Sequence, residues 1–278
     1  MASIHKNIIY VAGLPRSGST LMCQLLGEHP DIYSTGHSSP LANTIKGMRA
    51  RMSDDPFLLS QLDVDYDLVY QRLTNSYRGF INGWFEETDK SMVVDKNRSW
   101  LNGLETLSHL DPNFKMVVCI RDLRQIFASI ENRHQKTSLI DFPDDMADLT
   151  SYERADKLFS PQGVVGRPLR LIGQLQDVSV QLQKNLYYII FEDLMNEPIR
   201  VMQEVYHWLG ADNYIIDPNK LSVKQHESDS YYRFKYPHKT YDSIKPPALH
   251  DVTPRIGNDI TKEFEWYYKL FYPGLLSP

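Results

Sequence analysis

The sequence has few cysteines, no long apolar run and no excess of positive charge. Its two cysteines, Cys23 and Cys119, both fall in apolar periodic stretches of the 278 residues. Such positions indicate buried thiols in a reducing compartment rather than a disulfide framework. No segment approaches the roughly 20 apolar residues of a membrane-spanning helix, and the first residues lead into a strand pattern without a signal-peptide pattern. These absences predict a cytoplasmic protein with no membrane partner.

The composition also disfavours nucleic-acid and metal binding. The formal net charge is −5, with 30 lysines and arginines against 35 acidic residues, so there is no global basic field for nucleic acid. The nine histidines show neither H-x-x-x-H spacing nor an adjacent cysteine partner, and the sequence therefore predicts no metal site. Any anion site must be built locally.

Short apolar runs alternate with helical patterns along the chain. This alternation is typical of βαβ units around a parallel sheet. The predicted strands are residues 7–12, 31–35, 92–95, 115–120 and 187–191. The intervals 39–87 and 135–184 have mostly helical patterns and are predicted to be insertions around a substrate cleft. The periodicity fades over 211–258, which includes "SDSYYRFKYPHKTYDSIKPP"; its aromatic content favours an ordered lid. We expect one domain over residues 1–278.

The segment "YVAGLPRSGST" follows the first predicted strand and opens a helix. Gly13 and Gly18 have the spacing of the P-loop pattern G-x-x-x-x-G-K-[ST], but Ser19 stands where that pattern has lysine, and Thr20 follows it. Backbone N–H groups at a helix N-terminus attract an anion. The alternative interpretation is a glycine turn with an ordinary serine or threonine cap. The residues predicted to contact an anion are Arg16, Ser17, Gly18, Ser19 and Thr20.

The missing lysine disfavours a kinase or NTPase. In P-loop enzymes that lysine reaches the β- and γ-phosphates and helps Mg²⁺ to neutralise them. Asp95, at the end of a predicted strand, is a candidate metal ligand, but Lys96 stands beside it.

A second motif, "VVCIRDLRQIFASIENRH", combines a buried strand with Arg121 at its carboxyl end and a following helix. Ligands of open α/β sheets bind outside these strand ends. Ser129 and Arg133 are four residues apart, hence on one side of the helix. The three side chains are therefore predicted to bind a second anion, distinct from the first; the alternative is that the two arginines are solvated surface groups. Both motifs together predict a ligand with two separated phosphate-like groups.

These residues resemble the sulfotransferases that use 3′-phosphoadenosine-5′-phosphosulfate (PAPS). "PRSGST" (15–20) is similar to the family's loop for the 5′-phosphosulfate, and "RDLRQIFAS" (121–129) to its segment for the 3′-phosphate. The stretch "LMCQLLGEHPDIYSTG" is most similar to the protein-tyrosine and carbohydrate sulfotransferase branch, and "FEDLMNEP" (191–198) resembles the family's "YEDL…P" junction. The resemblance covers roughly the first 210 residues in scattered motifs.

The resemblance also implies individual roles. Lys96 in "VVDKNRSW" falls where the tyrosine-sulfating branch has a lysine that stabilises the leaving oxygen, a role that Arg16 is expected to share. His37 in "STGHSSP" stands near the family's glutamate base, and a histidine with an ordinary pKa near 6.5 suits proton abstraction; the alternative is that it only orients substrate. Phe191 replaces the family's tyrosine, so a hydroxyl contact to the nucleotide is lost, and either stacking or packing of the ring is expected to remain.

The resemblance thus implies an α/β fold of the P-loop type, with three layers in which helices flank a central parallel β-sheet. The implied reaction transfers a sulfuryl group from PAPS to an acceptor hydroxyl and releases 3′,5′-adenosine bisphosphate (PAP), without a metal. The acceptor can be a small molecule, a carbohydrate or a peptide, and the sequence does not indicate the oligomeric state. The alternatives are a P-loop kinase of a small metabolite, with Arg16 in place of the lysine, and a non-catalytic nucleotide-binding homologue.

Overall fold

A five-stranded parallel sheet forms the centre of the protein. The structure is a computed structural model that describes residues 3–136, 139, 146–223, 227–228, 237–238, 240–245 and 249–276. Neighbouring strands all pair in parallel, in the order β2-β3-β1-β4-β5. The strands are β1 (Asn7–Gly13), β2 (Ile32–Tyr33), β3 (Met92–Lys96), β4 (Lys115–Ile120) and β5 (Leu186–Ile190). The predicted α/β fold with a central parallel sheet is confirmed.

The five predicted strands are present, with differences at their ends. The prediction for 115–120 matches β4. The strand predicted at 31–35 is only two residues long, because β2 is an edge strand that pairs with β3 at Ile32 and Tyr33 alone. Phe191 is the first residue of a helix rather than the last of β5, so the prediction of a strand through residue 191 was wrong there.

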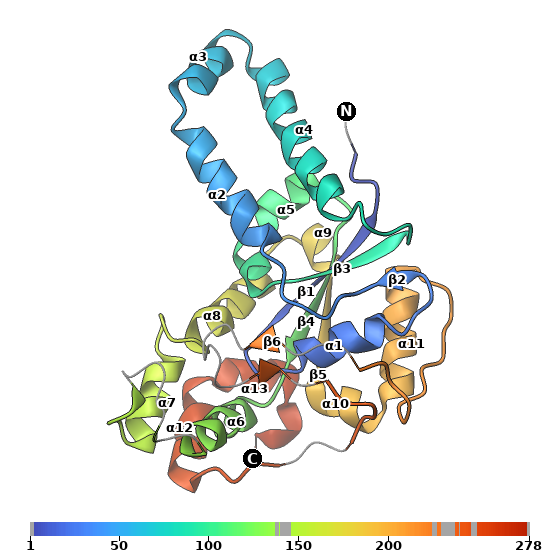
Figure 1. Ribbon diagram of the computed structural model, residues 1–278. Coiled ribbons are helices and arrows are strands. Elements are labelled where there is room, and N and C mark those ends of the chain that lie inside the picture. The colour runs from blue at the N-terminus through green and yellow to red at the C-terminus, as the bar shows by residue number, and fades with distance from the viewer. Residues whose placement is uncertain are drawn as a thin grey trace.

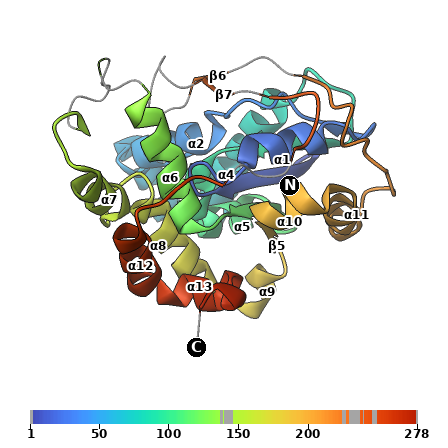
Figure 2. The same ribbon diagram turned by 90° about the horizontal axis from the view of Figure 1, so that it is seen from below.

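Helices cover both faces of the sheet (Figures 1 and 2). In chain order they are α1 (Ser19–Leu26), α2 (Leu41–Ser53), α3 (Pro56–Val64), α4 (Tyr66–Trp84), α5 (Leu104–Leu110), α6 (Leu123–Gln135), α7 (Ser151–Phe159), α8 (Gly166–Gln174), α9 (Val180–Gln183), α10 (Phe191–Asn196), α11 (Pro198–Leu209), α12 (Pro254–Glu263) and α13 (Glu265–Phe271). Single 3-10 turns occur at Arg98–Asn102, Leu175–Asp177 and Pro273–Leu275, and the short strands β6 (Glu227–Ser228) and β7 (Pro237–His238) pair antiparallel.

Alternate residues of β1 face two different helical layers. Tyr10 and Ala12 belong to a core that includes residues of α2, α4 to α8, α12 and α13. Ile9 and Val11 pack on the other side, against α1, α10 and α11. This alternation follows from the two-residue period of a strand, and both faces of the parallel sheet are covered by helices as such sheets require. Cys23 and Cys119 are buried free thiols in the second layer.

The two intervals predicted to be helical insertions contain helices. Helices α2, α3 and α4 occupy most of 39–87 and project from the body as an arm (Figure 1), and α7, α8 and α9 lie within 135–184. Much of the predicted lid at 211–258 lies outside the described residues, including Arg233 and Lys235. Two positions within this interval are bound to α1, where the Gln24 amide donates to the carbonyls of Ser222 and Tyr241 at 2.8 and 2.7 Å. Its role as a lid stays a prediction.

Gly13 ends β1 and pairs with Cys119 of β4. Its φ is +147°, and a Cβ built there would lie 2.4 Å from the carbonyl oxygen of Cys119. A contact this short cannot be relieved by side-chain rotation, because the neighbouring atom belongs to the backbone of β4. Glycine is therefore required at this position for the strands to remain paired.

We expect Gly13→Ala to lower the free energy of unfolding by about 2–6 kcal/mol, the sum of overpacking and backbone strain. Gly47→Ala is the matched control, since Gly47 lies within α2 and a Cβ there would meet nothing within 4 Å. The control should be stabilising by up to about 1 kcal/mol because alanine favours helices. Chemical denaturation measures both, and equal stability of the two variants would contradict this account.

Candidate active site

The glycine loop between β1 and α1 forms the N-terminal end of a helix, as predicted. Gly18 is the residue before α1 and has a left-handed conformation, with φ of +88°. A Cβ at Gly18 would also lie 2.4 Å from the ring of Phe191. Both the conformation and the close ring require glycine here. The N–H groups of the first turn of α1 have no acceptor within the helix, because no helical turn precedes them. They are therefore available to an anion.

The hydroxyl groups of the loop differ in what they contact. Ser17 is buried, and its hydroxyl donates to the carbonyl of Leu14 at 2.7 Å. This bond holds the loop together and uses the only proton that the hydroxyl has. Ser19 and Thr20 are half-buried in the first turn of α1. Of the three hydroxyls predicted to contact an anion, these two are the better placed.

Lys96 brings an ammonium group to this loop from the neighbouring strand. It is the last residue of β3 and pairs with Val11 of β1, two residues before β1 ends at Gly13. Its buried side chain donates to the hydroxyl of Thr20 at 3.3 Å and to the carbonyl of Gly36 at 2.8 Å. The loop lacks the P-loop lysine, and Lys96 supplies a positive charge to the same helix terminus from another element.

Asp95 faces the opposite side of the sheet from Lys96. Its carboxylate accepts a hydrogen bond of 2.6 Å from the indole N–H of Trp100 and is fully buried. Burial raises the pKa of Asp95, and hydrogen bonds from Ser39 and Trp100 oppose that rise. Such a carboxylate is unavailable as a metal ligand beside the loop. Among the residues that the structure describes, no cluster of three or more histidine, cysteine or acidic side chains is arranged to hold a metal.

His37 lies next to the contacts of Lys96. It follows Gly36, whose carbonyl accepts from Lys96, and precedes Ser38, which forms an isolated parallel bridge with Lys96. The backbone N–H of His37 donates to the hydroxyl of Thr35 at 3.3 Å, and the residue is exposed. The structure therefore brings the predicted base, the predicted lysine and the glycine loop together.

Arg121 occupies the carboxyl end of β4, as predicted, and its side chain is directed into the site. The guanidinium Nη1 donates to the carbonyl of Arg16 at 2.9 Å, and the group lies 4.5 Å from the centre of the Phe191 ring. Its Nε is buried with no hydrogen-bond partner among the described residues. Burial lowers the pKa of Arg121, whereas the carboxylate of Glu192 raises it.

The two predicted anion motifs are joined through Arg16. Its Nε donates to the hydroxyl of Ser129 on α6 at 3.3 Å, and its carbonyl accepts from Arg121. Arg133 follows Ser129 by one turn of α6 and is half-buried. The motifs predicted to form two distinct sites are thus adjacent parts of one positively charged surface.

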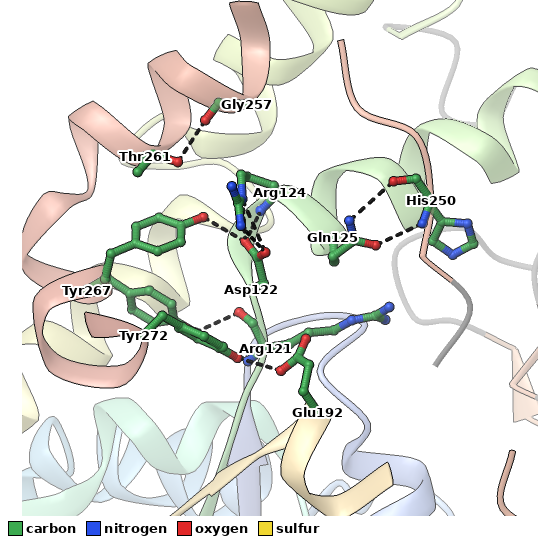
Figure 3. Close-up of polar contacts among 11 residues, drawn as sticks. Arg121, Asp122, Arg124, Gln125, Glu192, His250, Gly257, Thr261, Tyr267 and Tyr272 are labelled. Carbon is green, nitrogen blue, oxygen red and sulfur yellow. Dashed lines mark hydrogen bonds and ion pairs between the residues drawn. The ribbon is translucent and has the colours of Figure 1, made fainter. Parts of the chain in front are cut away.

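Sequence reasoning did not identify His250, which is anchored beside this surface (Figure 3). Its backbone N–H donates to the side chain of Gln125 at 2.9 Å, and its carbonyl accepts from the same amide at 3.2 Å. Its Nδ1 lies 3.3 Å from the amide nitrogen of Asn132. The pKa of His250 is lowered by burial and by the positive charges of Arg121, Arg16, Lys136 and Arg133. No motif marks this histidine, which lies in the aperiodic interval 211–258.

Tyrosines of α13 and the residue that follows it contact Arg121 and the acidic residues beside it (Figure 3). The hydroxyl of Tyr267 donates to the carbonyl of Arg121 at 2.9 Å and lies 3.3 Å from its backbone N–H. Tyr268 donates to Asp122, the residue that caps α6, and Tyr272 donates to Glu192 at 2.7 Å. A cavity of about 760 Å³ lies here, lined by Glu192, His250 and Tyr272 among others. Sequence reasoning did not identify the segment "EWYYKLF", which forms α13, as a contact of Arg121.

Comparison with known proteins identifies the family. The model of the sulfotransferase family matches residues 8–214. The chain belongs to the sulfotransferase family. Protein-tyrosine sulfotransferase 1 of Rattus norvegicus is 28% identical over 157 residues, which are 54% of this chain and 41% of that protein. The Homo sapiens protein of the same name is 28% identical over 155 residues, with the same shares. The resemblance inferred from the motifs is confirmed, and the matched stretch spans less than half the length of these relatives.

Solved sulfotransferase structures share the fold. The enzyme of Alicyclobacillus acidocaldarius superposes with a TM-score of 0.56 at 14% identity, covering 96% of each chain. A mouse sulfotransferase complexed with PAP has a TM-score of 0.50 at 10% identity, covering 98% of this chain and 88% of that one. At such identities the likeness concerns the fold alone. Within the described part of the chain, no helix combines the length and apolar character needed to cross a bilayer.

Proposed function

We propose that this protein transfers a sulfuryl group from PAPS to an acceptor hydroxyl and releases PAP. The observation that carries the proposal is the Arg16 contact that joins the glycine loop to Arg121 and Ser129. A donor with two separated phosphate groups needs two adjacent anion-binding surfaces, and this pair is of that kind. Family membership supports the reaction class, as does the mouse structural neighbour, which is complexed with PAP.

In this proposal the glycine loop and the second motif divide the donor between them. The N–H groups of the first turn of α1 bind the phosphosulfate, together with Arg16 and the side chains of Ser19 and Thr20. Arg121, Ser129 and Arg133 bind the 3′-phosphate. The buried Nε of Arg121 fits this role, because a buried donor without a partner is rare and an oxygen acceptor would satisfy it. The ring of Phe191, already against Arg121, provides an apolar contact for the nucleotide.

The proposed chemistry is an in-line displacement at sulfur. The acceptor oxygen forms a new S–O bond while the S–O bond to the 5′-phosphate breaks, and PAP departs with the bonding electrons. His37 takes the proton of the acceptor hydroxyl. Lys96 and Arg16 stabilise the charge that develops on the leaving oxygen, which is the most effective place for a fixed cation. Thr20, which accepts from Lys96, links this cation to the loop.

The binding part of the proposal is tested by calorimetric titration with PAP and with ATP, each with and without Mg²⁺. We expect PAP to bind independently of Mg²⁺ and Arg121→Ala to weaken it about 10- to 150-fold, as loss of charge-assisted hydrogen bonds worth about 1.5–3 kcal/mol implies. Arg170→Ala, an exposed position on α8, is the control and should bind normally. Unchanged affinity in a folded Arg121→Ala variant contradicts the assignment, and tight ATP binding that requires Mg²⁺ favours a kinase.

The catalytic roles are tested by sulfuryl transfer from labelled PAPS to a panel of phenolic, carbohydrate and peptide hydroxyls. His37→Ala is expected to reduce turnover about 10²- to 10⁴-fold, and Lys96→Met about 10²- to 10³-fold, with PAP affinity of the histidine variant unchanged. His5→Ala, another exposed histidine, is the control. Full activity of His37→Ala would remove this residue from the mechanism. Normal PAP binding without transfer to any acceptor would instead favour the non-catalytic homologue.

The position of His250 predicts a pH dependence of PAP binding. Surrounding cations and burial lower the pKa of His250, so the free protein holds it neutral. A bound phosphate offsets those cations and favours the imidazolium form, so binding takes up a proton and affinity rises as pH falls. We expect PAP to bind about three- to tenfold more tightly at pH 6.5 than at pH 8. His250→Gln keeps the Gln125 contacts, which involve only backbone atoms, and should lose this difference. Equal pH dependence in both proteins would rule out the role of His250.

A further inference from the structure

The arm formed by α2, α3 and α4 ends in α3, a nine-residue helix that packs against α4 and α2. Helix α3 has the sequence "PFLLSQLDV", yet none of its residues is buried. The exposed fractions reach 78% for Phe57 and 87% for Val64. Because an apolar helix needs a partner surface to be stable, its position at the outer end of a projecting arm indicates that something covers it (Figure 1).

The apolar surface continues from α3 onto the first turns of α4. The rings of Tyr66 and Tyr70 are stacked with centroids 5.5 Å apart, and both are exposed. We call this end of the arm, residues 52–71, the tip. Soluble monomers rarely expose such contiguous apolar patches without an interaction partner. Its large exposed apolar side chains include Phe57, Leu59, Val64, Tyr66, Leu68 and Tyr70.

Charge along the arm is sorted by position. The tip contains five aspartates and no lysine or arginine; they are Asp54, Asp55, Asp63, Asp65 and Asp67. The rest of the arm, which we call the stem (residues 41–51 and 72–84), has the opposite composition. It contains no acidic residue and five basic ones, which are Lys46, Arg49, Arg51, Arg72 and Arg78. Asp55 and Asp65 also cap α3 and α4.

We propose that the arms of two copies of this chain pair antiparallel about a two-fold axis, with each tip on the stem of the other. A two-fold interface places the same surface on both subunits, so it requires a patch that complements itself. An acidic apolar tip and a basic stem on one arm meet this requirement, because an antiparallel pair of arms then contains two equivalent contacts of tip with stem. At 1.5 Å per residue, the 19 residues of α4 extend about 28 Å, long enough to carry tip and stem as separate contact regions. The acidic tip argues against an anionic lipid surface, which would repel it.

The apolar part of the contact is tested by sedimentation of the full chain. We expect the wild-type protein to be a dimer at micromolar concentration. The double substitution Phe57→Ser and Val64→Ser should raise the dimer dissociation constant about 30-fold or more, as for buried anchor residues of an interface. Val180→Ser is the control, because Val180 is 71% exposed on α9 and lies outside the arm. A wild-type monomer, or a dimer that both variants leave intact, overturns the proposal.

Charge reversal tests whether the partner is a second copy in this orientation. One variant carries Lys46→Glu and Arg72→Glu in the stem, and the other Asp54→Lys and Asp63→Lys in the tip. Positions 54 and 63 lie at or near the C-terminus of α2 and of α3, where a positively charged side chain is tolerated. Each variant alone should dimerise more weakly than the wild type, because the net charge of the stem falls from +5 to +1 in the first variant and that of the tip from −5 to −1 in the second. An equimolar mixture should form heterodimers in preference to either homodimer, since one of its two contacts then pairs an unaltered tip with an unaltered stem.

Two results of the charge-reversal experiment would overturn the proposal. Failure of the mixture to associate would exclude pairing of tip with stem. A monomeric wild-type protein that sediments with vesicles of phosphatidylcholine would assign the tip to a lipid surface instead. Neither result bears on PAP binding, because the arm carries none of the residues proposed to bind the donor.

Discussion

The parallel direction of the five strands is the constraint on which the site depends. In a parallel sheet all carboxyl ends meet at one edge, and every strand of this sheet has a predicted site residue at or just past that end, while Ser129 and Arg133 lie further along α6. The glycine loop follows β1, His37 follows β2, Lys96 ends β3, Arg121 follows β4 and Phe191 follows β5. Strand pairing alone therefore places residues more than 170 positions apart in the sequence at the same edge of the sheet.

Within that edge, Arg16 connects the parts at a conformational cost. Its φ of 60° is unusual for a residue other than glycine and costs about 1–2 kcal/mol. The bonds from its Nε to Ser129 and from Arg121 to its carbonyl both involve charged groups, and such bonds contribute about 1.5–3 kcal/mol each. The two bonds therefore outweigh the strain. The left-handed turn is what directs the Arg16 side chain to α6 and its carbonyl to Arg121.

Local patterns made the sheet and the two motifs predictable, because a strand, a glycine turn and an amphipathic helix each leave a signal over a few residues. The sequence could not indicate that the Ser17 hydroxyl is used within the loop, since a serine that binds a ligand and one that closes a turn look alike. Nor could it assign His250 or Tyr267, which reach α6 and Arg121 from over 110 residues away and belong to no motif. Contacts of this kind depend on how α12 and α13 pack against the rest of the protein, and such packing leaves no pattern over a few neighbouring residues of the sequence.

The electrostatics of the site follow from how its acidic residues are occupied. The protein is acidic overall, at −5, yet Arg16, Arg121 and Arg133 lie close enough together to lower the pKa of His250. The nearest carboxylates have other contacts: Asp122 is bound by Arg124 and Tyr268, and Glu192 accepts from Tyr272. Glu192 offsets part of the charge on Arg121 but is held by a tyrosine on the far side. Tyr268 and Tyr272 thus occupy part of the hydrogen-bonding capacity of these carboxylates, which leaves the positive charge of Arg16, Arg121 and Arg133 less fully paired and suited to the proposed anion.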